Sequence, residues 1–94
     1  MSTQLSPEDD LDYARQLLEA SVFGAFICAI KARKHERSLT QADLARRIGK
    51  EKTRVSKLLS GPQNWTLATI SDLSEALDVR FEFALVDQTQ PARL

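Results

Sequence analysis

Residues 39–61 read LTQADLARRIGKEKTRVSKLLSG, and this stretch indicates the fold more clearly than the rest of the chain. Thr40 is a good helix-capping residue, and Asp43 follows three positions later, where its carboxylate can answer the cap. Gly49 supplies the left-handed backbone conformation that ends such a helix. The stretch therefore predicts a first helix at 40–48, followed by a tight turn and a second helix.

The second helix is expected at about 51–59. Val55 and Leu58 lie three residues apart, so one face of this helix turns inward toward a core. The outward face carries polar and basic residues: Thr53, Arg54 and Lys57. Such a unit holds one helix away from a small core, as a helix must be held to enter the major groove of DNA.

The spacing of eight residues in this stretch resembles the helix-turn-helix of the Cro/C1 repressor-like family, also called the XRE family. They are Gln41, Ala45, Gly49, Val55, Ser56, Leu58, Leu59 and Gly61. The resemblance covers roughly residues 26–85. It implies a mainly α, lambda repressor-like bundle of about five helices that binds operator DNA, usually as a homodimer.

Charge is segregated along the chain, although its formal net charge is zero. The segment 31–57 holds ten basic and three acidic residues, a net charge of +7, and the rest of the chain carries −7. A basic segment that coincides with the two predicted helices is the electrostatic footprint of a protein that binds a polyanion. With 94 residues, 43% of them hydrophobic, the chain can form one domain around its own core.

Other classes of function find little support in the sequence. A single His35 and a single Cys28 give no metal-ligand spacing, and no nucleophile motif or phosphate-binding glycine loop is present. We therefore expect neither an enzyme nor a cofactor or metal. Cys28 lies in an apolar run and is expected to be a buried, reduced thiol. The sequence shows no secretory signal and no apolar run near the ~20 residues of a membrane span, so we expect a cytoplasmic protein.

The N-terminal third predicts helix from Pro7 to about His35. Residues 1–6 are expected to be disordered, and the run Ser6-Pro7-Glu8-Asp9 is a strong helix start. Apolar residues follow at helical spacing: Leu11, Ala14, Leu17, Leu18 and Val22. Gly24 leaves open whether this region forms one helix or two.

A further helix is expected at 67–77, with Thr66 as its cap and Trp65 covering the end of the core. Its predicted inward face is Leu67, Ile70, Leu73, Ala76 and Leu77. The whole helical DNA-binding domain would then span 7–78.

The period changes after this helix. Residues 79–85 alternate apolar and mostly polar side chains, which predicts a strand within 79–87, followed by a flexible tail at 88–94. A lone strand with an apolar face invites pairing with the same strand of a second chain, so dimerisation is assigned to Phe81, Phe83 and Leu85. The alternative is an unpaired strand lying against its own helices.

The contacts expected on DNA divide into two sets. Base edges would be read from the exposed face of the second motif helix, by Lys52, Thr53, Arg54 and Lys57. Phosphates would be held by Gln41, Ser56 and Asn64. The family resemblance carries the assignments of Gln41 and Asn64, and it points most strongly to Lys52, Thr53 and Lys57 among the base contacts.

These observations favour a sequence-specific regulator, expected to be a repressor, that binds a two-fold-related operator in double-stranded DNA as a homodimer. The second hypothesis is the antitoxin of a toxin–antitoxin pair, with the helix at 7–20 binding the toxin protein. A third is an interaction module that no longer binds DNA, which the basic recognition face argues against.

Overall fold

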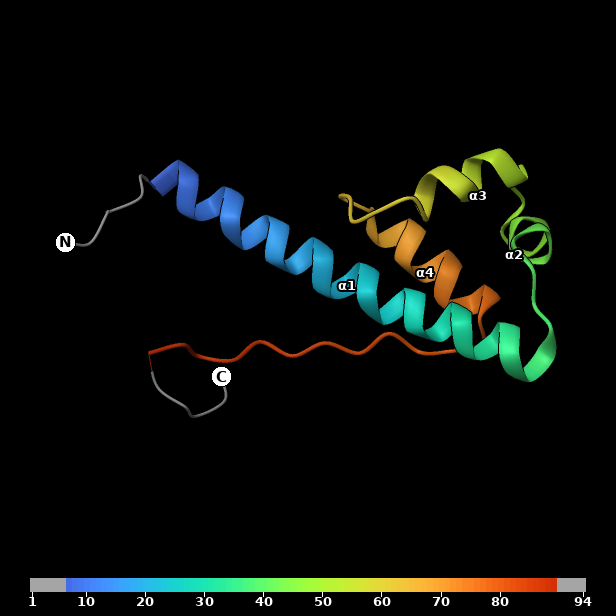
Figure 1. Ribbon diagram of the computed structural model, residues 1–94. Coiled ribbons are helices and arrows are strands. Elements are labelled where there is room, and N and C mark those ends of the chain that lie inside the picture. Colours follow the sequence, from blue (N-terminus) through green and yellow to red (C-terminus); the bar gives the residue numbers. More distant parts are fainter. Residues whose placement is uncertain (1–6, 90–94) are drawn as a thin grey trace.

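The computed structural model describes residues 7–89, and this part of the chain forms four helices and no strand. Helix α1 spans Pro7–Arg37, α2 Gln41–Ile48, α3 Lys52–Leu58 and α4 Leu67–Ala76. The three short helices pack beside the second half of α1, while its first half extends beyond them (Figure 1). The predicted disordered start at 1–6 lies outside the described residues, as does all but the first two residues of the flexible tail predicted at 88–94.

Helix α1 settles the question raised by Gly24, because it runs without interruption for 31 residues. It begins at Pro7 with acidic residues in its first turn and ends with basic residues in its last turn, as the helix dipole favours. A single glycine weakens a helix by about 1 kcal/mol, which packing of the flanking turns offsets. The expectation of about five helices is therefore replaced by four, since 7–35 is one helix.

The core lies where α2, α3 and α4 meet the second half of α1. Val55, Leu73 and Leu77 are completely buried, and Leu44 is almost so. The other buried apolar residues are Phe26, Leu39, Ala45 and Ala76. Each helix contributes at least one of these side chains, so the α2–α3 unit is fixed against the rest of the molecule by one continuous apolar cluster.

Three helix ends use a residue in the left-handed conformation. Gly49 ends α2 with φ 68°, and its amide and that of Lys50 bond back to the last turn of that helix. Ser38 (φ 56°) and Asp78 (φ 57°) do the same after α1 and α4, although neither is a glycine. Asp tolerates this conformation better than most residues, and each bend sends the chain back across the core.

Two arginines tie the C-terminal end of α4 to its neighbours. Arg33 of α1 donates from Nε to the carbonyl of Leu77 at 2.8 Å, and Arg47 of α2 donates to the carbonyl of Ala76 at 2.8 Å. Cations are favoured at this end of a helix, where the last carbonyls lack partners within the helix. These two side chains thus hold α1, α2 and α4 together.

The segment after α4 runs extended but forms no strand within the described chain, so the strand predicted at 79–87 is not confirmed. Phe81 stacks on Phe26 of α1 with ring centroids 5.8 Å apart. From there the segment continues toward the N-terminal end of α1 (Figure 1). A strand needs a neighbour for its backbone groups, and no other segment of residues 7–89 lies along residues 80–85 with hydrogen bonds to them. We call residues 79–89 the tail.

Two predictions about burial are wrong. Leu67, expected on the inner face, is 83% exposed, because it is the first residue of α4 and the core begins one turn later. Cys28, expected to be buried, is exposed, since it lies on the side of α1 opposite Phe26.

Helix α1 is also long and apolar enough, by length and composition alone, to cross a membrane, with a mean hydropathy of 1.2 in its most apolar window. The prediction that no stretch reaches this length is therefore wrong as stated. Core helices of soluble proteins pass the same test. Only 6% of that window is buried: Phe26 packs against Phe81 and Trp65, whereas the helix leaves Leu17 and Leu18 more than half exposed.

Candidate nucleic-acid interface

The start of α2 is fixed by a complete capping box. The Thr40 hydroxyl accepts from the amide of Asp43 at 3.1 Å, and the Asp43 carboxylate accepts from the amide of Thr40 at 3.0 Å. Arg46 also pairs with the Asp43 carboxylate. These contacts hold the pKa of Asp43 below its usual value, and the largest cause is the hydrogen bond from the Thr40 amide. The predicted cap is confirmed.

Gln41, the first residue of α2, is exposed and touches the neighbouring helix. Its Oε1 accepts a hydrogen bond from the Ser56 hydroxyl of α3 at 3.1 Å. Two residues predicted to hold phosphates therefore lie together, although they are fifteen positions apart. This contact brings the start of α2 and the middle of α3 to one surface, where both side chains remain open to solvent.

Helix α3 is anchored by one side chain and presents the others. Val55 is 0% exposed, so the helix is held with its opposite face outward. All four residues predicted to read bases are exposed on it: Lys52, Thr53, Arg54 and Lys57. A hollow of about 460 Å³ beside α3 is lined by Thr53, Arg54, Lys57 and the turn residues Gly49, Lys50 and Glu51.

The loop after α3 is held by a residue that the sequence interpretation missed. Gln63 donates from Nε2 to the carbonyls of Lys57 at 2.9 Å and Leu58 at 3.1 Å, which closes the C-terminal end of α3. Asn64 follows in the loop and is exposed, as a phosphate contact requires. Trp65 packs against Phe23 and Phe26 with ring centroids 5.9 and 5.5 Å apart, which confirms its predicted role in the core.

The ten basic residues of segment 31–57 divide into those that have a partner within the chain and those that have no ion-pair partner, which we call unengaged. Four arginines have partners within the chain: Arg33 with Glu36 and the end of α4, Arg37 with Asp78, Arg46 with Asp43, and Arg47 with Ala76. Among residues 7–89, the other six have no ion-pair partner: Lys31, Lys34, Lys50, Lys52, Arg54 and Lys57. These six cations, mostly lysines, are the ones available to a polyanion.

Two of these lysines lie on α1 and extend the basic surface formed by α3 and the start of α2. Lys31 and Lys34 line a hollow of about 300 Å³ that also includes Thr40 and Gln41 at the start of α2. Sequence interpretation counted both in the basic segment but did not place them near Gln41. Their spacing of three residues, which puts them on one side of α1, was the available signal.

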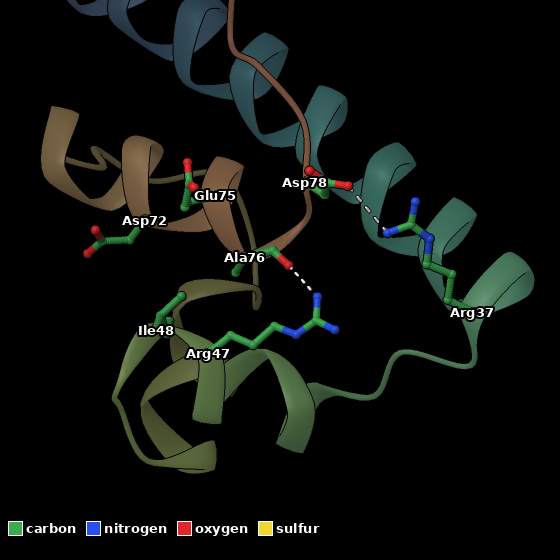
Figure 2. A pocket seen from close by; sticks show the side chains of 7 residues that line it. All are labelled: Arg37, Arg47, Ile48, Asp72, Glu75, Ala76 and Asp78. Carbon is green, nitrogen blue, oxygen red and sulfur yellow. Dashed lines mark hydrogen bonds and ion pairs between the residues drawn. The ribbon is translucent and has the colours of Figure 1, made fainter.

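A hollow of different charge lies at the junction of α2 and α4 (Figure 2). It has a volume of about 540 Å³, and its lining includes the carboxylates of Asp72, Glu75 and Asp78. The two arginines beside it are already engaged, Arg47 with the Ala76 carbonyl and Arg37 with Asp78. The exposed carboxylates of α4 disfavour the approach of phosphates on this side of the molecule.

Residues 30–83, more than half of the chain, match the profile of the helix-turn-helix family. The chain therefore belongs to the Cro/C1-type helix-turn-helix family, also called the XRE family. Helices α2 and α3 are the helix-turn-helix, and α3 is its recognition helix. Membership supports a DNA-binding transcriptional regulator, since this is a family of DNA-binding regulatory domains. No curated protein and no solved structure matches the chain significantly.

The capping box predicts a pH-dependent contribution to stability. Because the pKa of Asp43 is lowered in the folded protein, its charged form stabilises the fold above the ordinary Asp pKa of about 4. This contribution is lost as the pH falls through the folded pKa. The free energy of unfolding of wild type should therefore exceed that of Asp43→Asn at pH 7, and the gap should narrow below about pH 4.

Urea denaturation between pH 2.5 and 7 measures this gap. Thr40→Ser keeps a capping hydroxyl and is the matched control. The free energy of unfolding of Thr40→Ser should therefore exceed that of Asp43→Asn at pH 7, and this difference should narrow at low pH as it does for wild type. A gap that stays constant or widens as the pH falls would show that the Asp43 carboxylate does not stabilise α2.

Proposed function

We propose that this protein is a cytoplasmic, sequence-specific repressor that binds a two-fold-related operator as a homodimer. The observation that carries the proposal is the exposed face of α3, which is held outward by the buried Val55 and carries three basic side chains and one hydroxyl. A protein seated in the major groove over a promoter excludes other proteins from it. Repression is therefore the simplest regulatory action for this surface.

The assignment of base contacts rests on chemistry and position. Arg54 can form a two-pronged pair with guanine, Lys52 and Lys57 can donate to guanine acceptors, and Thr53 can contact a thymine methyl. All four are exposed and none has an ion-pair partner among the described residues. They start at the N-terminal end of α3, which is the end that a recognition helix points toward the bases.

The phosphate contacts flank this face on both sides. Gln41 and Ser56 lie together at the start of α2, with Lys31 and Lys34 beside them. Asn64 lies past the other end of α3, in the loop that Gln63 holds. A backbone that followed the groove along α3 would meet polar or cationic groups at each end, which fixes orientation without reading sequence.

The homodimer is supported by the apolar side chains that the tail leaves exposed. Phe81 is partly covered by Phe26, but Phe83 is 82% and Leu85 73% exposed. Arg80 and Glu82 pair with each other at 2.8 Å on the alternate positions, so the tail already has a polar and an apolar side. Antiparallel pairing with the tail of a second copy would satisfy its backbone groups and shield Phe83 and Leu85.

A second candidate function is that of an antitoxin that represses its own operon and binds a toxin protein. The favouring observation is the first half of α1, where Tyr13 and Leu17 are exposed beyond the helical bundle. Co-expression with the product of a neighbouring gene distinguishes the two. A complex that depends on Tyr13 and Leu17 would identify an antitoxin, and its absence leaves the repressor.

Binding to duplex DNA should depend strongly on salt, because the six unengaged cations displace counterions from phosphates. Each neutralised phosphate contributes about −0.9 to the slope of log K against log salt concentration. The three unengaged cations not assigned to bases, Lys31, Lys34 and Lys50, would give about −3, and all six at most about −5. Fluorescence anisotropy with a labelled duplex between 50 and 300 mM KCl measures the slope. Binding that is absent at low salt, or insensitive to salt, would remove the proposed function.

Substitutions should separate base reading from phosphate binding. Thr53→Ala and Lys57→Ala should each lower the preference for the specific operator over a scrambled duplex by about 1–3 kcal/mol, because they remove contacts to base edges. Gln41→Ala should weaken binding to both duplexes alike. The operator is first selected from random DNA, and competition assays then compare the variants. Equal losses on both duplexes for Thr53→Ala and Lys57→Ala would contradict the assignment.

Dimerisation should be lost in Phe83→Asp, because the substitution places a charge in the apolar interface between two tails. A buried unpaired charge costs several kcal/mol in order of magnitude. Ala84→Asp adds the same charge on the other side of the tail and is the control. Sedimentation velocity at micromolar concentration should show dimers for wild type and control. A dimer that survives in Phe83→Asp would exclude the tail as the interface.

A further inference from the structure

Helix α1 carries an apolar stripe whose N-terminal part the rest of the described chain leaves uncovered. Its members recur every three or four residues along one side of the helix: Leu11, Ala14, Leu18, Val22, Ala25 and Ala29. We call this set the α1 stripe. Val22 and Ala29 of this stripe pack against the core, whereas Leu11 is 58% and Leu18 65% exposed. Exposed apolar surface of this extent marks an interaction site on a folded protein.

The α1 stripe points to the side on which the tail runs. An apolar hollow of about 190 Å³ is lined by Ala25 and Ala29 of the stripe together with Val79 and Phe81 of the tail. Phe81 stacks on Phe26 at the same place. The tail and the stripe therefore begin side by side, and from this point both continue toward the N-terminal end of α1 (Figure 1).

Leu18 and the exposed tail residues lie at similar positions along the axis of α1. A tail residue advances about 3.3 Å and a helix residue about 1.5 Å, so two tail residues pass about four helix residues. Counting from Phe81 beside Phe26, Phe83 reaches the level of Val22 and Leu85 that of Leu18. Phe81, Phe83 and Leu85 share one side of the tail, so two apolar rows run along the same stretch with Leu18, Phe83 and Leu85 still exposed.

The chain's own bundle cannot cover this region, because the line of α1 that faces the core becomes charged. Going from Phe26 toward the N-terminus, this line reaches Glu19, Arg15 and Asp12, and Arg15 pairs with Asp12. The loop and α4 consequently contact only the second half of α1. Among residues 7–89, no segment covers Leu11 and Leu18 of the stripe.

We infer that the α1 stripe is the second half of the homodimer interface and that it packs against the tail of a second copy. This inference rests on the proposed homodimer. In an antiparallel pair of tails, each copy brings one α1 over the same side of the two-stranded ribbon. The two helices then run in opposite directions, so their acidic first turns lie at opposite ends and do not repel each other. Leu11 and Leu18 shield the apolar side chains of the partner's tail.

The experiment compares two pairs of equally exposed residues in the full chain by sedimentation equilibrium. Leu18→Glu lies in the stripe, and Leu17→Glu, about 100° around the helix, is its control; their exposed fractions are 65% and 54%. Leu11→Glu and Tyr13→Glu form the second pair. Glu is a good helix former, and far-UV circular dichroism checks that every variant keeps its helices.

The stripe variants should raise the dimer dissociation constant about a hundredfold or more, since each dimer loses two buried leucines. The controls should stay within about threefold of wild type. Unchanged dimerisation in Leu18→Glu and Leu11→Glu, with Phe83→Asp still monomeric, overturns this inference and leaves the proposed homodimer standing. Equal losses in stripe and control variants also overturn it, and a monomeric wild type overturns both proposals.

Discussion

The burial of Val55 is the constraint on which the recognition surface depends. Helix α3 has only seven residues, and a helix of that length is not stable by itself in water. It forms because Val55, with no exposed surface, packs among Leu44, Leu73 and Leu77. The same contact decides which side of α3 faces out. Because Val55 points inward, the four residues proposed to read bases are exposed together on α3: Lys52, Thr53, Arg54 and Lys57. The proposed recognition face therefore depends on one apolar contact.

Charge is arranged so that structural and binding roles do not overlap. Within segment 31–57, Arg33 and Arg47 bond to the carbonyls at the C-terminal end of α4. Arg37 and Arg46 pair with carboxylates. Mostly lysines remain for a polyanion. Arginine's planar fork makes directed hydrogen bonds, here to carbonyls, and binds phosphates as well, whereas lysine is a compact, flexible point charge that can pair with phosphates. The formal net charge of zero conceals this division, because the acidic residues lie largely on the first half of α1 and on α4.

Local chemistry made the helix-turn-helix predictable from sequence. Thr40 with Asp43, Gly49 and the inward Val55 act over a few residues, and the structure confirms each of them. Features that depend on distant partners were not predictable. The left-handed conformations of Ser38 and Asp78 depend on the path of the chain across the core, and Leu67 is exposed because packing begins one turn later in α4. The strand is not confirmed for the same reason, since alternation at 79–85 specifies an extended segment but supplies no partner within one chain.

Amide chemical-shift mapping with an operator selected from random DNA tests the central claim most directly, because it reports on every backbone amide at once. The account predicts large changes in α3, at the start of α2 and in the loop at Asn64. It predicts small ones at Asp72 and Glu75 on the acidic side of α4. Changes centred on α4 or on the first half of α1, with α3 unperturbed, would contradict the claim that Val55 holds α3 outward as the helix that reads DNA.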